Sequence, residues 1–206
     1  MGIFKKIFGT QRKASPTELT HQQVIDQTDA RLVEAEILLA TAAVAEQVSE
    51  VFEIEDGAMR WMVSLQVLSF FLHYMNRRAF AKKGPDFRAA IQDTITVSSI
   101  ERLYDSSWDT SNVKPGFDKE AFKQRAIEDS IEFINDAEEE LSTCKEIFSD
   151  IATARDTVLG CYTAGLLTGI GESDTHPLGL LVATTTLEAL TKSNIAKGID
   201  GTRLIS

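Results

Sequence analysis

Five polar side chains share one face of an otherwise apolar stretch, and they are the candidate ligand-binding residues of the chain. The stretch runs from Gly57 to Lys83. At roughly 100° per residue in a helix, the five side chains fall within an arc of about 100°. They are Gln66, Ser69, His73, Asn76 and Arg77. Amide, hydroxyl, imidazole and guanidinium groups inside a helical bundle are suited to line a polar cavity for a small anionic ligand.

A structural explanation of the same stripe stays open. The five side chains can simply mark where the helix meets water or satisfies polar groups of neighbouring helices. The basic residues that follow also have a plain role, because cations near a helix C-terminus complement the macrodipole. These residues are Arg77, Arg78, Lys82 and Lys83.

Motifs for metal or catalytic chemistry are incomplete. A di-iron bundle needs two Glu-x-x-His motifs, and the chain has one, from Glu18 to His21. Asp105 and Asp109 have a spacing found at Mg²⁺ sites, but they form a single pair in an expected loop. There is neither a P-loop nor a GxGxxG motif. We therefore expect no metal site and no cofactor, and we favour a non-catalytic protein. An enzyme whose site residues are distant in sequence stays open.

The two cysteines, Cys144 and Cys161, have neither CxxC spacing nor a metal-binding pattern with histidine. We expect free thiols and a reducing compartment. The apolar residues at the start are interrupted by Lys5 and Lys6, which does not resemble a secretory signal. The expected location is the cytoplasm, with peripheral association at the inner membrane face as an extension.

The extension rests on the first residues of the chain, which are basic and amphipathic. On a helical wheel the apolar side chains of MGIFKKIFG fall within about 140°, and two lysines lie opposite. Such a pattern is typical of a short interfacial anchor. The expected contact residues are Ile3, Phe4, Lys5, Lys6, Ile7, Phe8, Arg12 and Lys13. A tail that stays unstructured, or folds back on the body, is the alternative.

Charge is unevenly distributed along the chain. The formal net charge is −10, which argues against a general nucleic-acid binder because phosphate contacts need a basic face. Residues 1–16 hold four basic and no acidic residues, so the rest has 17 basic and 31 acidic residues, a net charge of −14. A basic arm on an acidic body favours contact with an anionic membrane or a protein partner. Homo-oligomerisation is left open.

The stretch from Gly57 to Lys83 is also the expected centre of the fold. Between Arg60 and His73 its apolar side chains cover nearly the whole circumference of a helix, which indicates a buried central helix. The uncharged run from Trp61 to Leu72 is twelve residues long. A membrane span needs about twenty, so we predict a core helix instead.

Start and stop signals predict the other helices. Helix starts are expected at residues that commonly act as caps, namely Ser15, Asp86 and Asp118, with a break open near Asp29. Gly84-Pro85 is a boundary and residues 105–116 are a loop.

Downstream of Asp118 the apolar period continues as far as Tyr162, so we expect one long helix, with a restart at Ser149-Asp150 as the alternative. A last helix is expected from Leu178 to Lys197, closed by Gly198.

These elements predict an all-α bundle of five or six helices around the central helix. Residues 1–14 form the arm and linker, residues 15–198 a single domain, and residues 199–206 a frayed tail. The expected function is a non-catalytic interaction or adaptor protein that its arm recruits to the cytoplasmic membrane surface. The alternatives are a ligand-binding or sensory bundle that uses the stripe around His73, and a helical enzyme with a non-linear site.

Overall fold

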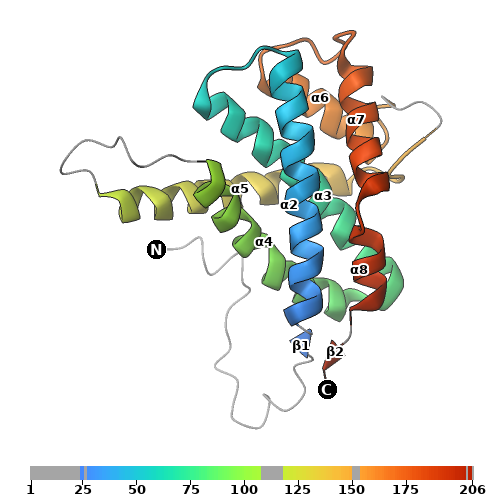
Figure 1. Ribbon diagram of the computed structural model, residues 1–206. Coiled ribbons are helices and arrows are strands. Elements are labelled where there is room, and N and C mark those ends of the chain that lie inside the picture. The colour runs from blue at the N-terminus through green and yellow to red at the C-terminus, as the bar shows by residue number, and fades with distance from the viewer. Residues whose placement is uncertain (1–23, 26, 108–117, 150–153, 203, 206) are drawn as a thin grey trace.

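The computed structural model describes residues 24–25, 27–107, 118–149, 154–202 and 204–205 (Figure 1). These residues form an all-α bundle, as predicted. Its elements are β1 (Val24–Ile25), α2 (Gln27–Val51), α3 (Gly57–Lys83), α4 (Pro85–Ser107), α5 (Lys119–Ser142), α6 (Val158–Gly169), α7 (Gly179–Lys192), α8 (Ile195–Gly201) and β2 (Leu204–Ile205). The N-terminal arm, the helix start at Ser15 and most of the predicted loop lie outside the described residues.

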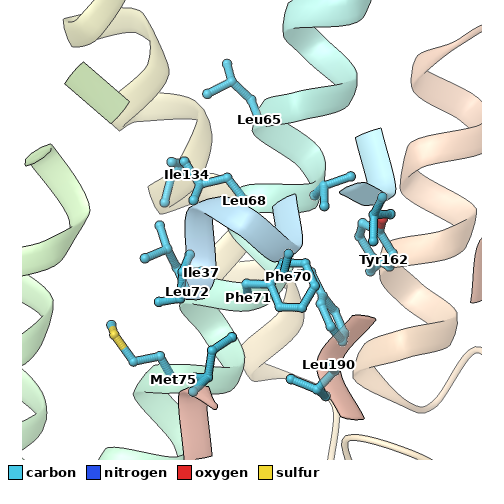
Figure 2. Close-up of a cluster of buried hydrophobic side chains, with 14 of the residues drawn as sticks. Ile37, Leu65, Leu68, Phe70, Phe71, Leu72, Met75, Ile134, Tyr162 and Leu190 are labelled. Atoms are coloured by element: carbon cyan, nitrogen blue, oxygen red, sulfur yellow. The ribbon is translucent and has the colours of Figure 1, made fainter. Parts of the chain in front are cut away.

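Helix α3 is the centre of the bundle and has the predicted bounds. Asp56 begins it by accepting a hydrogen bond from the backbone N–H of Met59 at 2.8 Å. Helices α2, α4, α5, α6 and α8 all pack against it. Figure 2 shows its side chains reaching different neighbours, with Leu68 toward Ile134 of α5 and Phe70 beside Tyr162 of α6. No helix among the described residues combines the length and apolarity that crossing a membrane requires.

Helix α4 begins two residues earlier than predicted from a cap at Asp86. Gly84 has a φ of 88°, a conformation that favours glycine, and Pro85 is already the first residue of α4. Asp86 therefore lies in the first turn and is not the cap. The apolar side chains of Phe87, Ile91 and Ile95 on α4 are buried.

The long helix expected after Asp118 is interrupted. Asp118 caps α5 as predicted, its side chain accepting from the Ala121 N–H at 3.0 Å. However, α5 ends at Ser142, and α6 begins only after Thr157. The apolar period was misleading here because Ile147 and Phe148 pack against the core from irregular backbone.

The C-terminal segment corrects the expectation of one last helix and a frayed tail. Ser193 and Asn194 separate α7 from α8, and Asn194 donates two hydrogen bonds to Glu36 of α2, at 2.9 and 3.2 Å. Ile199 is fully buried. Beyond α8, β2 pairs with β1 in antiparallel register, Val24 opposite Ile205, so the two ends of the described chain lie together (Figure 1).

Candidate functional site

The predicted polar stripe lies on the side of α3 that faces α5, and it is divided between two cavities. His73, Asn76 and Arg77 line the first, which we call the α3–α5 cavity and which has a volume of about 330 Å³. Gln66 and Ser69 line the second, the α3–α6 cavity, of about 230 Å³. The structure therefore brings three of the five predicted residues to one cavity and the other two to a neighbouring one.

His73 is almost completely buried and is held by Glu138 of α5. Its Nδ1 lies 2.9 Å from Oε2 of Glu138, and the other carboxylate oxygen accepts a hydrogen bond from Nη2 of Arg88 at 3.1 Å. An ionised carboxylate only accepts, so Nδ1 must carry the hydrogen. In the neutral ring, Nε2 is then an acceptor. Glu138 thus connects α3, α4 and α5 at the edge of the α3–α5 cavity.

Sequence reasoning missed Glu138 and Arg88 as site residues. Glu138 belongs to an acidic run that is typical of a solvated face, and Arg88 lies in the first part of α4, some 50 residues earlier in the chain. The usual expectation for a buried imidazole, that one nitrogen has a carboxylate or carbonyl partner, was the available signal. It could not say which acidic residue supplies the partner.

Arg77 has a structural role at the end of α5. Its Nη1 donates to the Cys144 carbonyl at 2.8 Å and its Nη2 to the Lys145 carbonyl at 2.7 Å. The guanidinium thereby anchors the irregular segment that follows α5 to the C-terminal part of α3. These two contacts fit the structural explanation of the stripe.

Two buried polar atoms at the same cavity have no hydrogen-bond partner among the described residues. They are Nε2 of His73 and Oδ1 of Asn76, and both side chains are at most 3% exposed. Leaving a buried donor or acceptor unsatisfied costs about 1–3 kcal/mol. Unlike Arg77, these two atoms are not explained by contacts within the fold.

The α3–α6 cavity is more acidic and better satisfied. Ser69 donates to the Gln66 backbone carbonyl at 2.7 Å, within its own helix. Asp136 and Glu140 line the same cavity from α5. A small anionic ligand is therefore disfavoured at this second cavity.

The basic residues at the end of α3 contact the C-terminal segment. Arg78 forms a bidentate ion pair with Asp200, with Nη2–Oδ2 and Nε–Oδ1 distances of 2.5 and 3.1 Å. This pair raises the pKa of Arg78 and lowers the pKa of Asp200, mainly through the hydrogen bonds between them. Lys83 donates to the Thr202 carbonyl.

The two cysteines are free thiols, as expected, but they are neighbours. Their sulfur atoms lie 3.1 Å apart. Burial and the hydrogen bond to Cys144 raise the pKa of the Cys161 thiol to about 12. Their separation of 17 positions in the sequence gave no sign of this proximity.

Groups of three or more His, Cys, Asp or Glu side chains arranged to hold a metal ion do not occur among the described residues. Compared with protein-family models, curated proteins and solved structures, the chain matches none of them. The candidate site therefore rests on its own geometry, and two of the buried side chains that line the α3–α5 cavity have a polar atom without a hydrogen-bond partner.

Proposed function

We propose that the protein is a non-catalytic binding protein that holds a small polar molecule in the α3–α5 cavity. The observation that supports this proposal is the pair of buried, unpartnered atoms at the cavity, Nε2 of His73 and Oδ1 of Asn76. With Nδ1 of His73 donating to Glu138, both atoms are acceptors in the neutral state. A ligand with N–H or O–H groups would satisfy them.

The charges around the cavity suggest the rest of the ligand. Glu138 offers a negative group, and Arg77 and Arg88 offer two positive ones. The Arg88 side chain comes from α4 and is 39% exposed. A negatively charged group on the ligand would therefore lie toward Arg88, with the hydrogen-bond donors toward His73 and Asn76. A volume of about 330 Å³ suits only a small molecule.

Native mass spectrometry of the protein as purified tests this proposal. We expect a retained small molecule in the wild type and its loss in Asn76→Leu and in His73→Phe. Thr94→Ala on α4 is a matched control, because the Thr94 side chain is exposed and bonds only to its own helix. If the wild type retains nothing and both cavity variants unfold at higher urea than the wild type, the polar stripe serves packing alone.

We further propose a second function, recruitment to an anionic membrane surface through residues 1–14. The supporting observation is in the sequence: an apolar wedge and four basic residues precede a body of net charge −14. Partial burial of the four apolar side chains would contribute about 4–6 kcal/mol. The acidic body and the ordering of the arm oppose this, so the association should be weak, with Kd roughly millimolar to micromolar.

Co-sedimentation with vesicles tests recruitment. We expect binding to anionic but not zwitterionic vesicles, fading as salt is raised. Deletion of residues 1–13, or Phe4→Glu combined with Phe8→Glu, should abolish binding without lowering Tm. A deletion that instead lowers Tm by many degrees would show that the arm is part of the folded core, and it would overturn the recruitment proposal.

A further inference from the structure

The two free cysteines occupy the two ends of the break between α5 and α6. Cys144 follows the C-cap residue of α5 and is buried, whereas Cys161 lies in the first turn of α6 and is half-buried. The sulfur–sulfur distance of 3.1 Å is about 1 Å longer than a disulfide bond. A small side-chain movement would therefore bring the two sulfurs to bonding distance.

The backbone already holds the two segments side by side. The N–H of Val158 donates to the Glu146 carbonyl at 2.9 Å, and the N–H of Leu159 donates to the Ile147 carbonyl at 3.1 Å. Arg77 binds the carbonyl of Cys144 itself. The proximity of the thiols thus follows from fixed backbone contacts rather than from the side-chain rotamers alone.

We propose that Cys144 and Cys161 form a reversible intrachain disulfide when the protein meets a low-molecular-weight disulfide such as oxidised glutathione. One cysteine thiolate attacks a sulfur of the oxidant, forming a mixed disulfide and releasing one small thiolate. The other cysteine thiolate attacks the protein sulfur of the mixed disulfide and releases the second. Two protein thiols are oxidised and one small disulfide is reduced to two thiols, so atoms and electrons balance.

The surroundings of Cys161 make this reaction slow at neutral pH. Burial raises the pKa of its thiol to about 12, and Cys144, Glu140 and Asp156 act in the same direction. Only the thiolate attacks. Below the pKa, the thiolate fraction rises about tenfold for each unit by which the pH is raised, and the rate of attack rises with it. We expect the disulfide to form more quickly at pH 8.5 than at pH 7, in a protein that stays reduced in a reducing compartment.

The disulfide would lie between the two cavities. Cys161 lines the α3–α6 cavity, and the Cys144 carbonyl is held by Arg77, which lines the α3–α5 cavity. Oxidation would join the end of α5 covalently to the start of α6 at this point. The inference does not depend on a ligand in either cavity.

Equilibration of the full-length protein in glutathione redox buffers tests the inference, with the products read by intact mass. We expect the loss of two hydrogen masses and no retained glutathione. The variants Cys144→Ala and Cys161→Ser each retain one thiol, so their reaction should stop at the glutathione adduct or not occur. Both variants should fold, because Ala or Ser replaces a small side chain. An adduct as the final product of the wild type, or a disulfide only between two chains, would overturn the proposal.

A second measurement separates a fold-supported disulfide from a chance one. The fold makes the disulfide harder to reduce by the same factor by which the disulfide stabilises the fold. The loop-closure estimate for this spacing puts that factor at about two hundred. The quotient [GSH]²/[GSSG] at which half of the disulfide is reduced should therefore be larger by about that factor for the native protein than for the urea-unfolded protein. An equal quotient in the two states, or easier reduction in the native state, would show that the fold does not favour the bond.

Discussion

Both ring nitrogens of His73 can form hydrogen bonds, but only one of them has a partner. Nδ1 is fixed by Glu138, while Nε2 has no partner among the described residues. The carboxylate of Glu138, on another helix, therefore determines which ring nitrogen carries the hydrogen. As a result, the atom at the cavity, Nε2, is a hydrogen-bond acceptor in the neutral ring. This is the residue on which the ligand-binding proposal depends most.

Replacing Glu138 by alanine removes the hydrogen-bond partner of the His73 ring. Glu138→Ala leaves Nδ1 of His73 and one side of Arg88 without their acceptor, and we expect it to lower the free energy of unfolding by about 1–3 kcal/mol. Glu139→Ala is the matched control, because Glu139 is exposed and should cost less than about 0.5 kcal/mol. Urea unfolding of the two variants makes the comparison. Equal midpoints would mean that the His73–Glu138 contact does not stabilise the fold.

The apolar core depends on large side chains of α3. Leu68 is fully buried, and Leu68→Ala should cost about 2–5 kcal/mol through lost burial and the cavity it leaves. Glu55 is exposed in the turn before α3, and Glu55→Ala should cost less than about 0.5 kcal/mol. The urea midpoint reports both, and similar values for the two would contradict the burial assignment.

The burial of the α3 side chains was predictable from the sequence, but the contact of His73 with Glu138 was not. Apolar side chains on all sides of one helix require neighbours on all sides, so the burial of Leu68 and Phe70 follows from pattern alone. The position of His73 on a polar stripe follows from spacing. Its partner Glu138 comes from a separate helix, and sequence gives no register between helices that are far apart in the chain.

Helices α8 and α2 are packed closely at Gly198. A Cβ added at Gly198 would lie 2.7 Å from Cγ2 of Val33 on α2. Real Cβ contacts are longer, and valine cannot turn away easily because its χ1 is restricted. Gly198 therefore lets α8 approach α2.

We expect Gly198→Ala to lower the free energy of unfolding by about 1–3 kcal/mol, since overpacking outweighs the gain in helix propensity. Gly201→Ala is the matched control, because nothing lies within 4 Å of its added Cβ. Combining Gly198→Ala with Val33→Ala should cost less than the sum of the two single changes. Strict additivity in thermal or urea unfolding would show that the two positions do not meet.

The start of α5 was predictable from the sequence, whereas its end was not. Asp118 caps α5 through its own side chain, a local interaction that the sequence displays. The end of α5 at Ser142 depends instead on Arg77 and on contacts between residues 146–147 and 158–159. These interactions join separate parts of the chain, so the apolar period alone wrongly extended the helix to Tyr162.

The C-terminal segment completes the bundle. Ile199 is fully buried, Thr202 is buried, and Lys83 bonds to the Thr202 carbonyl. Truncation after Gly198 should therefore lower the free energy of unfolding by at least about 2–5 kcal/mol, the usual cost of losing one large buried side chain. Circular dichroism during urea unfolding would show this, and an unchanged midpoint would support the frayed tail expected from sequence.

The Arg78–Asp200 pair in that segment predicts a pH dependence. Asp200 has a lowered pKa in the folded state, so its contribution to stability is present above its unfolded pKa, about 3.9, and is lost as the pH falls through the folded value. Both side chains are partly exposed, so we expect Asp200→Asn to cost less than about 1 kcal/mol at pH 7. The difference from the wild type should vanish in strong acid. A difference that grows as the pH falls would contradict the assignment.

The packing of α2 against both α7 and α8 also has a consequence for synthesis on the ribosome. Helix α2 is translated first among the helices described here, yet the surfaces that cover part of it are translated last. Val33 meets Gly198, and Glu36 meets Asn194, more than 150 residues later in the chain. Until those residues leave the exit tunnel, one apolar side of α2 faces solvent, and chaperones that bind exposed apolar segments would find it there in the nascent chain.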